Sequence, residues 1–292
     1  MALNQQPNSA TPEAERAYGA LPFPRVTPSL LRLVRSGRVF SLQQTMRPTM
    51  PQWEAQPKYS LKPALTHAAS AEIMRPPVTG AFERIEHSGH SGTHIDALCH
   101  VGCMHAGTAY LHGEVPANTV ETAQGFTDLG AEHFPPIVVR GILLDIPAIK
   151  GCERLPDRYE ITVADIQECE RRQGVAVEPG TAVLIRSGFE SLWDSDPERY
   201  MLQSAGPLLA GARYLAEQGC ILTGADTANY EVVNFPDLPA HMFLIYERGI
   251  PIVENLRLSE LAASGSYEFL FIALPIAFAG STGSSLHPIA IT

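Results

Sequence analysis

Long apolar stretches are missing from this chain of 292 residues. No run approaches the roughly 20 apolar residues that a membrane-spanning helix needs. The N-terminus also lacks the basic and then apolar pattern of a secretory signal. Because no linker rich in glycine, serine or charge divides the chain, we expect one domain over residues 38–292, preceded by an N-terminal arm and short helix over residues 1–37. The expected location is cytoplasmic, with no membrane partner.

Cysteine and basic residues are both scarce. The five cysteines form no CxxC pair, which argues against a sulfur-rich structural zinc site, and their odd number fits reduced thiols. Lys and Arg number 21 against 31 Asp and Glu, so the net charge is -10. Nucleic acids and anionic membranes select a basic face, so neither is an expected partner. The sequence also has no GxSxG motif, which makes a serine nucleophile an unfavoured interpretation.

Apolar patterning predicts an α/β fold. Nearly continuous apolar runs over residues 137–146, 181–186 and 220–224 are typical of strands buried on both faces. Helices are predicted over residues 162–173 and 207–218, each followed by a glycine that can end it. Further predictions are a short capped helix near residues 27–36, strands at 38–42, 79–86, 250–256 and 269–274, a helix at 241–248, a lid-like or helical excursion at 101–133, and a flexible loop at 280–285.

Three histidines and one aspartate fall close together at His90, His94, Asp96 and His100. A straight strand rises about 3.3 Å per residue, so residues four apart reach one ion only if the backbone bends. Gly92 can supply that bend. Beyond it, His94 and Asp96 are two residues apart and would point to the same side of an extended chain. Imidazole with carboxylate suits zinc, manganese, iron or nickel, and an open hydrolytic site is the favoured interpretation.

A second polar cluster lies in the last third of the chain. Glu254 sits within an apolar run, where a carboxylate is costly unless it is paired or metal-bound. His241 opens the preceding helical segment. The spacing alone leaves two interpretations. His241 and Glu254 either complete a metal coordination set, or His241 caps a helix and Glu254 is a carboxylate at the end of a strand. Asp226, just after a predicted strand, is expected to cap backbone N–H groups.

The motif resembles the HxGTHxDxxxH signature of the putative cyclase family of metal-dependent hydrolases, which includes bacterial kynurenine formamidase and isatin hydrolase. The similarity extends over roughly residues 38 to 292. It includes the proline- and tryptophan-bearing loop at residues 47–53, the central strands at 143–145 and 184–188, the strand end at 224–227, and the segment with His241 and Glu254.

This resemblance implies an α/β fold of the swivelling β/β/α type with a mixed central sheet, and a homo-oligomer. It implies a divalent metal, Zn or Mn, as cofactor. His90, His94 and Asp96 would hold a first ion. His100, His241 and Glu254, with Asp96 bridging, would hold a second ion where one is present.

The expected activity is hydrolysis of the C–N bond of a small amide, aryl formamide or lactam by metal-activated water. His100 or Glu254 would take a proton from the water and return it to the leaving nitrogen. Two alternatives stay open. One is a metal-dependent cyclase or lyase acting on a small carbonyl compound, and the other is a family member that binds metal or ligand without catalysis.

Overall fold

The computed structural model describes residues 23–24, 26–233 and 237–292. The N-terminal arm predicted over residues 1 to about 24 therefore lies almost entirely outside the described residues. The short helix predicted after it is present as α2, whose N-cap Thr27 accepts a hydrogen bond from the backbone N–H of Leu30.

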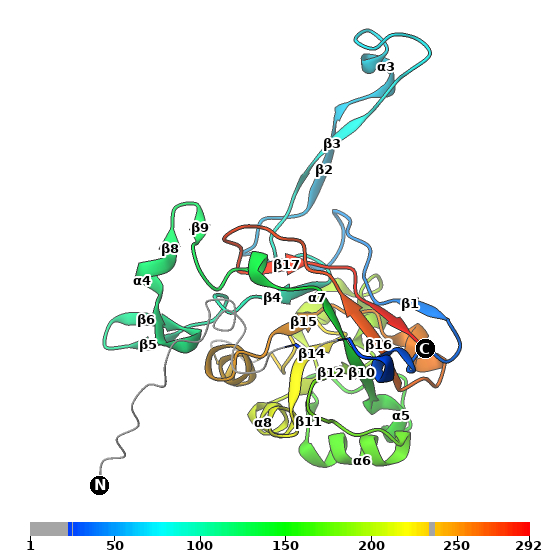
Figure 1. Ribbon diagram of the computed structural model, residues 1–292, viewed down its shortest axis with the longest axis vertical. Coiled ribbons are helices and arrows are strands. Elements are labelled where there is room, and N and C mark those ends of the chain that lie inside the picture. The colour runs from blue at the N-terminus through cyan, green and yellow to red at the C-terminus, as the bar shows by residue number, and fades with distance from the viewer. Residues whose placement is uncertain (1–22, 25, 234–236) are drawn as a thin grey trace.

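Within the described residues, a nine-stranded mixed sheet forms the centre of the molecule (Figure 1). The strand order is β1-β18-β16-β10-β12-β14-β15-β4-β17. Strands β10, β12, β14 and β15 are parallel, whereas β4 is antiparallel to both of its neighbours. The bounds are β1 Val39–Ser41, β4 His94–Asp96, β10 Ile137–Asp145, β12 Thr181–Arg186, β14 Cys220–Ala225, β15 Ile252–Glu254, β16 Glu268–Ala273, β17 Gly283–Ser285 and β18 Ile289–Ile291. The predicted α/β class with a mixed central sheet is confirmed.

The central strand β10 is apolar because both faces of the sheet are covered. Ile142 and Leu144 belong to one buried cluster, while Leu143, between them, belongs to the cluster on the opposite face. Alternate residues of a strand point to opposite faces, so a strand covered on both sides needs apolar side chains at nearly every position. Helices α6 and α8 contribute Ile166 and Leu215 to the first cluster.

The two predicted main helices begin and end near their expected residues. In α6, Thr162 and Asp165 form a reciprocal capping box, and Gly174 ends the helix in the left-handed conformation. No helix in the described part of the chain combines the length and apolar character needed to cross a bilayer. The helices are α2 Pro28–Leu31, α3 His67–Ser70, α4 Ala117–Val120, α5 Ile146–Lys150, α6 Val163–Gln173, α7 Pro197–Leu202, α8 Leu209–Glu217, α9 Pro239–His241, α10 Ser259–Ala263, the π-helix η4 Met242–Glu247 and the short η1 His112–Glu114, η2 Ala131–His133 and η3 Phe189–Leu192.

Several short strands lie outside the central sheet. The predicted strand at residues 79–86 is β3 Phe82–Glu86, which pairs with β2 Ser60–Leu65 in a hairpin that extends away from the body (Figure 1). The excursion at residues 101–133 is not a helical insertion, because it combines five short strands with the short helices η1, α4 and η2. It contains β5 Cys103–His105, β6 Thr108–Leu111, β7 Val115–Pro116, β8 Glu121–Thr122 and β9 Gly125–Phe126, and a separate pair joins β11 Glu160–Ile161 to β13 Gly206–Pro207.

The prediction of a flexible loop over residues 280–285 is wrong for its last three residues. Gly283–Ser285 form β17, which pairs antiparallel with β4. The strand predicted at 269–274 is β16, and a further strand that was not predicted, β18, follows β17. Strand β17 consists of glycine and serine, so no alternation of apolar residues reveals it.

Candidate metal centre

Strand β4 places His94 and Asp96 on one side of the sheet. Their Nε2 and Oδ1 atoms are 3.5 Å apart, and both side chains are buried. Ile95, between them, points into the apolar cluster on the other face. The shared orientation expected from two-residue spacing is therefore confirmed, and two potential ligands come from one three-residue strand.

The backbone turns immediately before and after this strand. Gly92 adopts a φ of +62°, and the turn before it brings His90 Nδ1 to 2.9 Å from Asp96 Oδ1. A side chain at Gly92 would also be strained by its backbone conformation and crowded by Met46. After the strand, the N–H of His100 donates to the carbonyl of Ala97, and His100 Nε2 lies 4.0 Å from Asp96 Oδ1. The bend predicted at Gly92 is confirmed.

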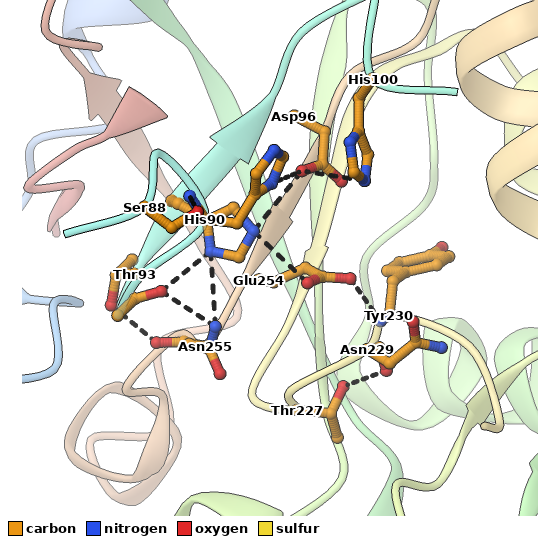
Figure 2. A network of polar contacts seen from close by, with 12 residues as sticks. Ser88, His90, Thr93, Asp96, His100, Thr227, Asn229, Tyr230, Glu254 and Asn255 are labelled. Carbon is orange, nitrogen blue, oxygen red and sulfur yellow. Dashed lines mark hydrogen bonds and ion pairs between the residues drawn. The ribbon is translucent and has the colours of Figure 1, made fainter. Parts of the chain in front are cut away.

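The second polar cluster joins the first through β15. Because β15 pairs with β4 with Glu254 opposite His94, Glu254 Oε2 lies 3.4 Å from His94 Nε2. His241, at the end of α9, places Nε2 at 3.2 Å from Glu254 Oε1 and 3.8 Å from Asp96 Oδ2. The other five predicted site residues therefore meet around Asp96, and Figure 2 shows His90, His100, Asp96 and Glu254 converging.

Buried hydrogen bonds fix the orientation of His94 and His241, the two buried histidines that form the inner side of the cluster. The carboxylate of Glu231 accepts from His241 Nδ1 and from the backbone N–H groups of Ala240 and His241. His94 Nδ1 lies 2.9 Å from the carbonyl of Gly92, so the Nε2 of each ring is left to face the carboxylates. Such contacts select the tautomer and ring orientation of a metal-binding histidine.

Further contacts hold the remaining groups. Glu254 Oε1 accepts a hydrogen bond from the N–H of Tyr230 (Figure 2). Asn255 donates to the Gly92 carbonyl, and His90 Nε2 lies 2.9 Å from Thr282 Oγ1. The carboxylate of Asp226 accepts three hydrogen bonds from Ser187 and Gly188, so its predicted role as a backbone cap is confirmed.

Glu231, Asn255 and Thr282 were not identified from the sequence. A signal existed for Glu231, because it stands next to Tyr230 and two valines, as Glu254 stands among apolar residues. The roles of Asn255 and Thr282 depend on contacts across 163 and 192 residues of chain. No local pattern encodes such contacts.

Burial and neighbouring groups shift the pKa values of the cluster residues, downward for some residues and upward for others. Burial disfavours a charged ring and lowers the pKa of His100 to about 3, although Asp96 opposes the shift. Burial also disfavours the charged form of His241, but hydrogen bonds with Glu231 and Glu254 outweigh it and raise its pKa to about 10. Asp96 is buried too, yet the imidazoles of His100, His90 and His94 hold its pKa well below its ordinary value. Asp96 is therefore an anion at neutral pH.

These residues fit a divalent cation. The buried Asp96 Oδ2 accepts no hydrogen bond from any described residue, so an anionic oxygen is left without a donor. Ligand atoms of His94, Asp96 and Glu254 lie within 4.8 Å of one another, as do those of His90, Asp96 and His100. Asp96 belongs to both groups. The resemblance implied one ion held by His90, His94 and Asp96 and a second held by His100, His241 and Glu254 with Asp96 bridging, and that division between two ions stays a prediction.

Comparison with known proteins gives a consistent family. A family model described as "Putative cyclase" matches residues 40–232. The solved structure of a novel cyclase is 29% identical with a TM-score of 0.84, covering 96% of this chain and 95% of that one. Among curated proteins, no sequence matches this chain.

More distant solved structures share the fold. Isatin hydrolase A from Labrenzia aggregata has a TM-score of 0.65 at 22% identity, over 90% of this chain and 98% of that one. A predicted metal-dependent hydrolase from Bacillus stearothermophilus has a TM-score of 0.55 at 20% identity, over 87% of this chain and 98% of that one.

Proposed function

Because the chain belongs to the putative cyclase family, we propose that it is a metal-dependent hydrolase that cleaves the C–N bond of a small amide, aryl formamide or lactam. The observation that carries the proposal is the convergence of four imidazoles and the carboxylate of Glu254 on the carboxylate of Asp96, whose buried Oδ2 accepts no hydrogen bond from a described residue. Structural similarity to isatin hydrolase supports the choice of a cyclic or aryl amide.

The inner residues His94, Asp96 and Glu254 would hold a divalent ion, Zn or Mn, with His241 and the outer pair His90 and His100 around it. A divalent ion there would polarise the substrate carbonyl and make an attacking water more acidic. The anionic Asp96 offsets positive charge within the cluster.

His100 is the better of the two candidates for proton transfer. Both oxygens of Glu254 are already engaged, Oε1 by Tyr230 and His241 and Oε2 by His94. The His100 side chain is 32% exposed, so its edge is accessible to water and substrate. His100 would accept a proton from the attacking water and return it to the leaving nitrogen. Nearby Asp96 would stabilise the transient positive ring.

Metal removal and restoration test the proposal. The purified protein is expected to contain zinc or manganese by elemental analysis. Thorough chelation should abolish turnover on a panel of aryl formamides, small amides and lactams, and Zn²⁺ or Mn²⁺ should restore it. Turnover that persists in fully metal-free protein would contradict the proposal.

Isotopically labelled water separates hydrolysis from the cyclase or lyase alternative. Hydrolysis in H₂¹⁸O places the label in the carboxylate product, because the attacking oxygen comes from water. Product formation without label would reject hydrolysis and favour cyclisation or elimination.

A further inference from the structure

The π-helix η4 begins directly after His241 and therefore carries this candidate ligand at its N-terminal end. In a π-helix an N–H donates to the carbonyl five residues before it, and here the N–H of Arg248 donates to the carbonyl of Phe243. The Arg213 guanidinium on α8 lies 4.5 Å from the centre of the Phe243 ring. Short π-helical segments are frequent at functional sites, so the contacts that hold η4 in place bear on the position of His241.

The last turn of η4 is bound by a segment that we call the clasp, defined as residues 103–116, which comprises β5, β6, η1 and β7. His112 Nδ1 lies 2.8 Å from the carbonyl oxygen of Tyr246. Because a carbonyl can only accept, the ring nitrogen donates, and it serves a carbonyl at a helix end, where the helix itself offers few donors. The Tyr246 hydroxyl in turn donates to Glu114 Oε1 at 2.9 Å. The clasp and η4 each donate one hydrogen bond to the other.

The backbone of the clasp is bent at this junction. Gly113 and Glu114 have φ values of +72° and +62°. A glutamate rarely adopts this left-handed conformation, and such a residue persists where the surrounding contacts determine it. The bend places Glu114 within reach of Tyr246. The clasp is therefore shaped locally for its contact with η4.

The other end of the clasp is continuous with His100. The clasp begins three residues after His100, and the connection packs tightly on β6, because a Cβ atom at Gly102 would lie 2.9 Å from the carbonyl oxygen of Tyr110. The ring centres of His100 and His241 are 6.5 Å apart. One of these two facing rings is thus joined to the clasp and the other to η4.

We propose that the clasp fixes the spacing between His100 and His241, with His112 and Tyr246 as positioning residues. Strand pairing holds the ligand candidates on β4, whereas His100 follows that strand and His241 lies on α9, outside the sheet. The hydrogen bonds between the clasp and η4 supply the restraint that these two rings do not receive from the sheet. This role depends on the proposed metal site but not on which reaction takes place there.

Zinc affinity of His112 variants tests this role. His112→Leu removes the donor to Tyr246, whereas His112→Asn places an amide N–H near the position of Nδ1. The affinity of metal-free protein for Zn²⁺, measured by competition with a chelator, should fall about 10-fold in His112→Leu, at the lower end of the range for residues that orient a ligand. His112→Asn should restore it to near the parental value. His105→Leu, which changes an exposed histidine in β5 of the same clasp, is the matched control and should leave the affinity unchanged.

The outcomes distinguish the clasp from the metal site itself. A parent protein that binds no Zn²⁺ would overturn the proposed metal site and, with it, this role of the clasp. A parent that binds Zn²⁺ no more tightly than His112→Leu would overturn the role of the clasp alone. Failure of His112→Asn to bind more tightly than His112→Leu would also reject the hydrogen bond as the positioning contact.

Thermal unfolding separates positioning from general stability. Metal-free parent and metal-free His112→Leu should have melting temperatures within roughly 4 °C of each other, because one partly buried hydrogen bond contributes little to the stability of a chain of this size. Tyr246→Phe, which removes only the exposed hydrogen bond to Glu114, should lower the Zn²⁺ affinity less than His112→Leu does. A loss of affinity that merely follows a loss of folded protein would show that His112 stabilises the fold and would reject its positioning role.

Discussion

The inner and outer sides of the ligand cluster differ in how firmly their side chains are held. On the inner side, the side chains of His94 and His241 are each 3% exposed, and their second ring nitrogens contact a backbone carbonyl and Glu231. On the outer side, both ring nitrogens of His90 have partners, Asp96 and Thr282, but His100 is 32% exposed and its Nε2 is 4.0 Å from Asp96, beyond hydrogen-bond distance. The inner side has the rigidity that holding an ion requires. The outer side has the access that substrate and proton exchange require.

The largest expected effect comes from breaking the inner side. His94→Ala removes a buried ring that faces both Asp96 and Glu254. The bound metal should fall to near zero and turnover should be abolished, with a loss in metal affinity above the 10- to 100-fold range of a residue that only orients a ligand. Elemental analysis and kcat/KM are the measurements, and His105→Ala, an exposed histidine on β5, is the matched control. Full metal content in His94→Ala would contradict the inner assignment.

An outer-side substitution should separate metal binding from catalysis. His100→Gln keeps a polar side chain but removes the proton acceptor. The metal content should stay close to that of the parent, while kcat should fall by about 10² to 10⁴ with little change in KM. Metal titration and steady-state kinetics on the same preparation give both values. If the variant loses its metal, His100 is a ligand and the contrast between the two sides fails.

A smaller effect is expected from the residue that orients His241. Glu231→Gln preserves the shape of the side chain but weakens its contact with His241 Nδ1. Metal affinity should fall about 10- to 100-fold, the usual cost of losing such an orienting carboxylate. Competition with a chelator measures it. The control Glu217→Gln, at the exposed end of α8, should leave the affinity unchanged; an unchanged affinity in Glu231→Gln would remove its positioning role.

The sequence predicted those parts of the structure that have a local physical signal. Strands β10, β12 and β14 are continuous apolar runs because they are buried on both faces. Helix α6 is marked at both ends by Thr162 and Gly174. Gly92, with the histidines around it, indicated a bent ligand segment before any tertiary contact was known.

Features that depend on contacts between distant segments could not be predicted from local sequence patterns. Strand β17 lacks an apolar pattern, and only its pairing with β4 makes it a strand. The pairing of β2 with β3 was not predicted because both strands lie in an exposed hairpin, without the one-sided burial that produces an alternating apolar pattern. The grouping of His94 with Glu254 follows from strand register across 160 residues, which the spacing of ligands along the chain does not specify.

The position of β4 also determines when this part of the central sheet can form during synthesis. Its partners in the sheet, β15 and β17, are Ile252–Glu254 and Gly283–Ser285, so both are translated long after His94–Asp96. At about 5 to 20 residues per second, β17 emerges on the order of 10 to 40 s after β4. Until β15 emerges, the histidine-rich strand has neither neighbour. The segment with most of the ligands is thus made early but cannot pair within the sheet until most of the chain has been made.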